Sequence, residues 1–147
     1  MQLRQQDIKS LLAEVNENIS IIEQEIKKVI SDKSIKEILK PKVKTCLEHL
    51  RSCLDFCAHD IYEIILQPIL GTPNRRFYFP YGSSYEEFYS SLCKNKFKQL
   101  IRHNEKIYDL IESIQPFRLK NNWLLDLCKS TNYNKHGVNN VHIIHNY

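Results

Sequence analysis

Three polar side chains near the end of the chain, Lys129, Asn132 and His136, have types and a spacing that could bind or cleave a phosphodiester. On a helix, all three lie within about 60° of Leu125, so they continue an apolar face that also holds Cys128. A surface helix normally places its polar residues opposite its apolar face. The spacing therefore predicts a polar stripe that points inward or toward a groove. The alternative is a solvated helix end, because Asn, Lys, His and Gly also serve as capping residues.

The position of His136 gives it a chemical role if the stripe is a site. In the last turn of a helix, the dipole favours an imidazolium. Histidine has an ordinary pKa of about 6.5, so a modest upward shift leaves a protonated fraction at neutral pH. A general acid or a phosphate contact needs such a fraction. A neighbouring Lys or Arg would oppose the shift, and its sign stays open at this point.

A second candidate cation is Arg51, in the segment "LRSCLDFCAHD". With Leu50 as the reference of the apolar face, Arg51 lies about 100° around the helix, at the border of that face. Its apolar stem can pack while the guanidinium reaches a neighbouring helix. Asp55, one turn later, could pair with it. Both a structural ion pair between helices and a functional cation fit this pattern.

The composition predicts that these residues are held by one all-α domain over residues 1–147. Hydrophobic residues make up 42% and charged residues 26%, as in an ordinary globular protein. Only three glycines are present, too few for the turns of a many-stranded sandwich or barrel. The net charge of +4 is compatible with phosphate-bearing partners without identifying one.

Helical periodicity and capping signals predict an irregular up-and-down bundle of about five helices with one aromatic loop insert. Apolar residues recur at spacings of three and four from about residue 5 to 30 and again from 43 to 65, where Pro68 should end the helix. A short helix is expected at 35–39, with Pro41 in the first turn of the next one. Caps are expected at Ser84 (with Glu87), at Asn104, and at Asn121 or Asn122, before helices that carry the remaining apolar residues.

The insert "RFYFPYG" follows Arg75 and combines aromatic side chains with a second arginine, Arg76. Such a segment could stack bases while its arginines contact phosphates. It could instead plug the end of the bundle, which is the interpretation we favour. The tail beyond Gly137 contains a β-like core, "VHII".

No metal or cofactor is expected. Cys46, His49, Cys53 and Cys57 would spread over about 16 Å of one helix, so one tetrahedral ion could reach at most two of them. His142 and His145 could chelate only weakly without partners. No apolar run approaches the roughly 20 residues that span a bilayer. The polar N-terminus and five cysteines, an odd number, predict a cytoplasmic protein with free thiols.

Four segments between residues 43 and 137 together resemble the HEPN (higher eukaryotes and prokaryotes nucleotide-binding) family. They are "LRSCLDFCAHDIYE", "RFYFPYG", "IYDLIESIQPF" and "NNWLLDLCKSTNYNKHG". They look like bacterial proteins with an early Arg-x-x-Leu-Asp pattern and a late Asn-x-x-Lys-His pattern. The resemblance implies a compact helical bundle, often a homodimer. Many members are metal-independent ribonucleases of toxin–antitoxin, CRISPR-associated or phage-defence systems, so RNA or a nucleotide and a cognate antitoxin or defence protein are the implied partners.

The resemblance implies a catalytic role for His136, which would move a proton while the RNA 2′-hydroxyl attacks the adjacent phosphate. Catalytic members carry an Arg a few residues before this His, whereas the corresponding slots here hold Thr131, Ser130 and Lys129. Lys129 keeps the charge without the bidentate grip on phosphate. We therefore name Arg51 as an alternative cation and Asn132 as an orienting residue, with Arg75, Arg76 and Lys135 as RNA contacts. The other interpretation is a non-catalytic dimerisation or nucleotide-binding module of the same shape.

Overall fold

The computed structural model describes residues 4–28, 34–72 and 78–136, with side chains described for 4–28, 39–72 and 78–132. Within these ranges all regular structure is helical, which confirms the predicted all-α class. The elements are α1 (Gln5–Lys28), α2 (Ser34–Ile61), a π-helix (Tyr62–Leu66), α3 (Gln67–Leu70), α4 (Tyr85–Lys94), a 3-10 turn (Phe97–Gln99), α5 (Leu100–His103), α6 (Glu105–Ser113), α7 (Pro116–Leu119) and α8 (Trp123–His136). None of the described helices is both long enough and apolar enough to cross a membrane.

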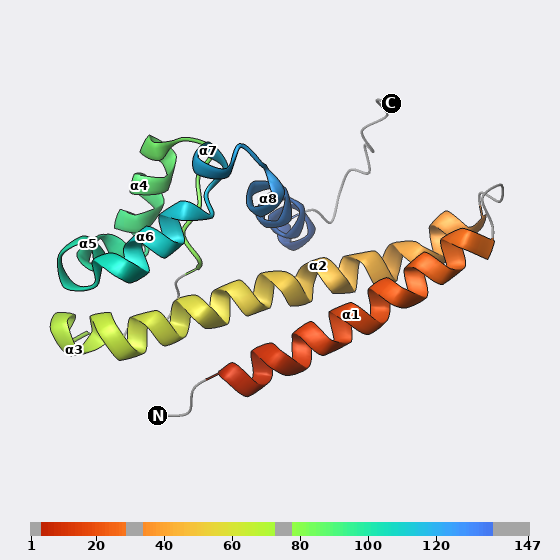
Figure 1. The fold of residues 1–147 in the computed structure, drawn as a ribbon, viewed down its shortest axis with the longest axis horizontal. Coiled ribbons are helices and arrows are strands. Elements are labelled where there is room, and N and C mark those ends of the chain that lie inside the picture. Colours follow the sequence, from red (N-terminus) through yellow and green to blue (C-terminus); the bar gives the residue numbers. More distant parts are fainter. Residues whose placement is uncertain (1–3, 29–33, 73–77, 137–147) are drawn as a thin grey trace.

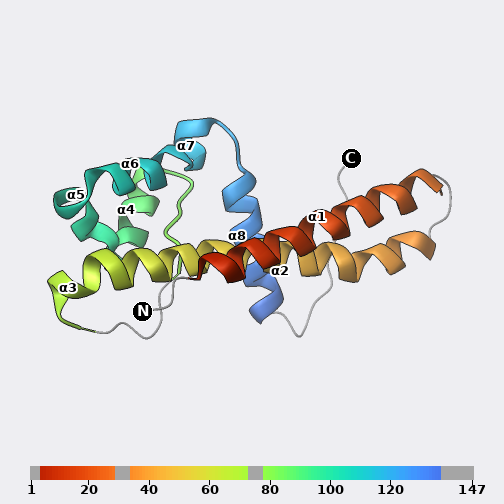
Figure 2. The ribbon, with the colours of Figure 1, turned by 60° about the horizontal axis from the view of Figure 1, so that its bottom comes forward.

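Two long helices organise the molecule. Helices α1 and α2 run side by side, antiparallel, as a hairpin (Figure 1). The shorter helices α4 to α7 gather over the second half of α2, and α8 crosses α2 steeply near its middle (Figure 2). Helix α2 is therefore the element that the other layers share.

The outer part of the hairpin, residues 16–28 of α1 and 39–46 of α2, forms an arm that extends beyond α8 (Figure 1). Its helices pack on each other, and Leu39 and Cys46 are buried there. Ile19, Ile26 and Val43 of the arm are exposed.

The prediction of a separate short helix before Pro41 was wrong, because α2 is continuous from Ser34 and Pro41 lies inside it. Proline removes one backbone hydrogen bond and usually kinks or ends a helix. Here Leu39 and Cys46 are buried on either side of it, so packing within the arm holds the helix through this position.

Pro68 does not end the second long helix either. The chain continues from α2 through the π-helix into α3, where Pro68 occupies the first turn and needs no N–H partner. The segment ends at Gly71, whose φ of +66° is the left-handed conformation that glycine adopts without strain. Tyr62 and Leu66, at either end of the π-helix, are both buried, and the Tyr62 hydroxyl donates to the Thr72 carbonyl at 2.8 Å.

The predicted caps are confirmed. Ser84 Oγ accepts a hydrogen bond from the Glu87 N–H at 3.3 Å and begins α4. Asn104 Oδ1 accepts from the Ile107 N–H at 3.2 Å and begins α6. Asn121 Oδ1 accepts from the Trp123 N–H at 2.8 Å, and the carbonyl of Asn122 accepts from the Asp126 N–H at 2.8 Å, so both candidate asparagines take part in the cap of α8.

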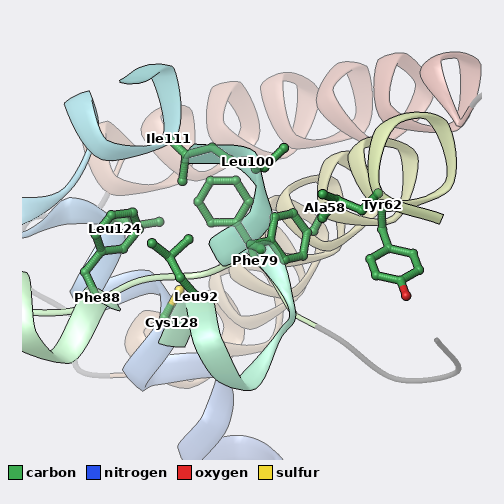
Figure 3. Packing of buried hydrophobic residues seen from close by; sticks show 11 residues of the cluster. Ala58, Tyr62, Phe79, Phe88, Leu92, Leu100, Ile111, Leu124 and Cys128 are labelled. Atoms are coloured by element: carbon green, nitrogen blue, oxygen red, sulfur yellow. The ribbon is translucent and has the colours of Figure 1, made fainter. Parts of the chain in front are cut away.

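The core lies between the second half of α2 and the short helices (Figure 3). Phe88 and Leu92 from α4, Leu100 from α5 and Leu124 from α8 are fully buried there. Phe79 of the aromatic segment joins the same cluster, so this residue does plug the bundle as we favoured.

Arg4 ties the start of α1 to the end of α2. Its guanidinium donates to Asp60 Oδ1 at 2.8 Å and to both carboxylate oxygens of Glu63 at 2.8 and 3.0 Å. The hydrogen bond from Arg4 is the largest cause that lowers the pKa of Glu63 below its ordinary value. The two helices are thus clamped electrostatically at the end of the hairpin opposite the arm.

This clamp makes a pH-dependent contribution to stability. Because the folded-state pKa of Glu63 is lowered, its contribution is complete above the unfolded pKa and is lost as pH falls through the folded pKa. We expect Glu63→Gln to lower the free energy of unfolding by about 1 kcal/mol at pH 7, and this difference to shrink and vanish as pH falls through the lowered folded pKa of Glu63. Urea denaturation at several pH values measures it, with Glu17→Gln, an exposed carboxylate of α1, as the control. A difference that persists unchanged at low pH would contradict the clamp.

Candidate functional site

The described residues form a small polar cavity of about 280 Å³ where α2, the aromatic segment, α4 and α8 meet. We call it the guanidinium pocket. Its lining consists of one cation, three aromatic rings, a hydroxyl and two amides: Arg51, Tyr78, Phe79, Tyr81, Ser91, Asn95 and Asn132. This volume lies just below the range of about 300–1,000 Å³ that is usual for ligand sites, so the pocket suits a small group such as a phosphate, with the remainder of a larger ligand outside.

Arg51 is only 4% exposed, well inside the apolar border predicted for it. Its Nε donates to Asp55 Oδ2 at 3.3 Å, which confirms the ion pair along α2. Its Nη1 contacts Cys128 Sγ on α8, so the guanidinium does reach a neighbouring helix. These contacts use the Nε–H and one Nη1 hydrogen, and the guanidinium keeps further N–H groups for a ligand.

Two phenol rings lie against this cation. The guanidinium carbon is 5.4 Å from the ring centroid of Tyr81 and 5.9 Å from that of Tyr78. At these distances the negative faces of the rings stabilise the buried charge. Tyr78 is 50% exposed, so one aromatic wall of the pocket is open to solvent.

Backbone hydrogen bonds to side chains hold the aromatic segment in place. Asp55 Oδ1 accepts from the Phe79 N–H at 3.0 Å while its other oxygen holds Arg51. Asn95 Oδ1 accepts from the Tyr78 N–H at 2.9 Å, and Ser91 Oγ accepts from the Tyr81 N–H at 3.3 Å. An irregular segment without strand partners thereby satisfies its backbone donors, which fixes both tyrosine rings over Arg51.

Asn132 closes the pocket from α8. Its Nδ2 donates to the Tyr81 hydroxyl at 2.9 Å. Burial is the main cause that raises the pKa of Tyr81, so the phenol is neutral at physiological pH. A neutral phenol that accepts one hydrogen bond still has a proton to donate. The pair therefore presents an amide and a hydroxyl beside the guanidinium.

Cys128 is a neutral thiol and no nucleophile. It is fully buried, and burial raises its pKa to about 11, although the nearby Arg51 charge acts in the opposite direction. Since the thiolate is the reactive species, the sulfur serves here as a packing group and a weak acceptor for the guanidinium.

The cysteines should differ strongly in their reactivity. Cys93 is exposed, whereas burial raises the pKa of Cys46, Cys53 and Cys57 as well as that of Cys128. In the native protein at pH 8 we expect iodoacetamide to modify Cys93 at least ten times faster than Cys128. Mass spectrometry of peptides over time measures this, and urea-unfolded protein, with all five labelled alike, is the control. Equal native rates at Cys93 and Cys128 would show that the pocket wall opens readily.

The structure brings two of the predicted site residues together, Arg51 and Asn132. Lys129 is exposed on α8 and does not line the pocket, and its charge acts instead on Glu87 at the start of α4. The predicted inward stripe is therefore divided, because Lys129 and Asn132 lie on adjacent faces of the helix.

The other predicted residues fall outside what the structure describes. Helix α8 extends to His136, one turn beyond Asn132, but the side chains of Lys135 and His136 are not among the described residues. Arg75 and Arg76 lie in the undescribed range 73–77, and the "VHII" tail lies in 137–147.

Ser91 and Asn95 were not predicted as site residues, whereas Tyr78 belongs to the aromatic insert for which base stacking was the less favoured interpretation. Ser91 and Asn95 belong to a helix that the sequence assigned to the core through Phe88 and Leu92. Their spacing of four places both on one face of α4, which is a signal for a shared polar neighbour. The sequence could not show that this neighbour is the aromatic segment.

Nothing in the described ranges gathers three His, Cys, Asp or Glu side chains in a way that could hold a metal ion. Comparison with known proteins adds no assignment, because no family model, curated protein or solved structure matches the chain.

Proposed function

We propose that the chain is a HEPN-like helical domain that binds a nucleotide in the guanidinium pocket. One observation carries this proposal: Arg51 is buried against two phenol rings, and the Asn132 amide and the Tyr81 hydroxyl line the same pocket. A guanidinium fork is suited to a phosphate, and an exposed tyrosine ring such as Tyr78 is suited to stacking on a base.

The charge of the site favours a monophosphate bound with moderate affinity. Asp55 already offsets the charge of Arg51, so the pocket attracts a phosphate less strongly than an unpaired guanidinium would. Stacking on Tyr78 would supply about 1–3 kcal/mol more. We expect a dissociation constant on the order of 100 µM for a nucleoside monophosphate.

Isothermal titration with AMP, GMP, CMP and UMP tests the proposal, with inorganic phosphate as a ligand that cannot stack. Asn132→Ala and Tyr78→Ala should each weaken binding about tenfold, because each removes one pocket contact from a side chain outside the core. Lys129→Ala, on the same helix but outside the pocket, is the matched control. Equal binding by all three variants and the wild type would place the ligand elsewhere.

A metal-independent ribonuclease is the second candidate. It is supported by the meeting of Arg51 with Asn132 and by the position of His136 one turn further along α8. The described pocket lining itself contains no carboxylate or imidazole that could act as a general base. This observation makes binding the stronger proposal.

The two functions separate in one assay. Purified protein is incubated with single-stranded RNA in excess chelator, alongside His136→Ala and Asn132→Ala. A ribonuclease loses cleavage in both variants, whereas a binding domain leaves the RNA intact in every sample. Cleavage that survives in His136→Ala would rule out this residue as the catalyst.

The HEPN resemblance also suggests an oligomeric state and partner proteins for this chain. We propose a homodimer that acts with an antitoxin or another defence protein in a bacterial cytoplasm. Sedimentation equilibrium over a range of protein concentrations tests the dimer independently of the ligand, and a monomer at all concentrations would contradict it.

A further inference from the structure

A second hollow lies along α2, and unlike the polar guanidinium pocket it is lined mainly by apolar side chains. Two apolar cavities of about 560 Å³ and 520 Å³ lie along it. Both are lined by Ile8, Leu54 and Cys57, so they form one continuous furrow. Helix α1 is one wall of the furrow, and α6 and α8 form the other.

The floor of this furrow is one straight helix face. It extends from Leu47 through Leu54 to Ile61, at spacings of three and four residues. At 1.5 Å per residue, that is a floor about 21 Å long. Its side chains are only half-buried, in contrast to the fully buried face that α2 turns to the core.

Large apolar side chains on the walls of the furrow are exposed to solvent. Leu110 of α6 is 61% exposed, Trp123 of α8 is 42% exposed and Leu12 of α1 is 40% exposed. Single exposed hydrophobic residues are ordinary, but a continuous apolar concavity marks an interaction surface.

The charge of the furrow is one-sided. Asp60 and Asp126 are the charged side chains among its described lining residues, and both are acidic although the whole chain carries +4. Arg4 already pairs with Asp60, so Asp126 supplies the negative charge that a ligand would meet. Asp126 is exposed at the rim, on the first turn of α8. A ligand with cationic flanks complements this rim, and an anionic lipid or nucleic acid does not.

We propose that the furrow binds an amphipathic helix of another protein, whose apolar face lies along α2 and whose Lys or Arg residues flank that face. A floor about 21 Å long matches about four turns of helix, with contacts at i, i+3, i+4 and i+7. An extended peptide has less to gain, because strand addition needs an open sheet edge and the furrow is built from helices.

A selection experiment tests the proposal without a known partner. The full-length protein is used to select from a displayed library of 16-residue amphipathic helices, with a fixed Leu stripe and flanking positions randomised among Lys, Glu and Gln. We expect the selected helices to be enriched in flanking Lys at least fivefold over flanking Glu. Recovery of Lys, Glu and Gln in equal proportion, or no enrichment of any helix, would overturn the proposal.

Variants locate the binding surface. Leu110→Gln combined with Trp123→Gln should weaken binding of a selected peptide more than tenfold, as measured by fluorescence anisotropy. Both side chains are exposed, so thermal denaturation should show an unchanged fold. Leu119→Gln with Ile69→Gln alters equally exposed residues outside the furrow and is the matched control. Equal weakening by both pairs would overturn the assignment.

Charge reversal distinguishes the partner from a second copy of this chain. Asp126→Lys should reduce binding of the Lys-flanked peptide and improve binding of its Glu-flanked counterpart. Sedimentation equilibrium of the wild type and the Leu110→Gln, Trp123→Gln variant completes the test. A wild-type dimer that this variant dissociates would show that the furrow holds another copy, and the proposal would fail.

Discussion

Replacing Gly82 by alanine is expected to destabilise the protein by more than about 3 kcal/mol, a large part of the stability of an ordinary domain. A Cβ at this position would lie 2.7 Å from the Glu87 carbonyl carbon and 2.8 Å from Phe88 Cα, and it would also collide with the Phe88 nitrogen. These are backbone atoms of α4, so no side-chain rotation can relieve the clash.

The position of Gly82 is fixed from the other side as well. Its N–H donates to Gln115 Oε1 at 3.1 Å, and Gln115 Nε2 donates to the carbonyl oxygens of Pro80 and Ile111. All of Gln115 is buried, so moving the segment would leave these polar groups without partners. The aromatic segment can therefore not shift away from α4 to accommodate a methyl group.

Urea denaturation followed by circular dichroism measures this effect. Gly71→Ala is the matched control, because a Cβ at Gly71 meets nothing within 4 Å and the substitution costs only the strain of its positive φ, about 1 kcal/mol. A Gly82→Ala protein as stable as Gly71→Ala would show that the segment packs less tightly on α4 than described.

Arg51→Met is the second substitution with a large expected effect. It should lower the free energy of unfolding by about 3 kcal/mol, because it leaves the carboxylate of Asp55 largely buried without its cation. It also removes the only guanidinium of the described pocket lining, so nucleotide binding should fall below detection. Urea denaturation and isothermal titration measure the two effects separately.

The double variant Arg51→Met, Asp55→Asn shows whether the unpaired charge is the cause. Asn at 55 is uncharged, but its Oδ1 can still accept from the Phe79 N–H. We expect it to recover more than about 1 kcal/mol of stability without restoring nucleotide binding. If the second substitution recovers nothing, the loss arises from cavity formation at Arg51 instead.

Local chemistry made much of this fold predictable. The caps at Ser84, Asn104 and Asn121 depend on neighbours within three residues, and the pair of Arg51 with Asp55 depends on one helical turn. Such contacts follow from helix geometry alone. The all-α class likewise follows from periodicity and from the scarcity of glycine.

The remaining features depend on contacts between distant segments. Pro41 lies within a helix whose neighbouring residues Leu39 and Cys46 are buried in the arm, which no local rule indicates. The pocket exists because Asn95 and Asp55, forty residues apart in the sequence, both hold the backbone of the aromatic segment. For a related reason, the sequence gives the spacing of Lys129 and Asn132 along α8 but not which of the two reaches the pocket, and Lys129 lies outside it.

The arm formed by the outer parts of α1 and α2 has a consequence for how the molecule opens. Amide hydrogen exchange should be fastest in its outer turns, since two helices that cover only each other leave one side of each to water. Opening there would leave Arg51 and the aromatic segment in place, because their contacts lie with Asp55 of α2, with α4 and with α8, all outside the arm. The tip can thus unravel and reform as a small cooperative unit of its own, while the remainder of the fold keeps its shape.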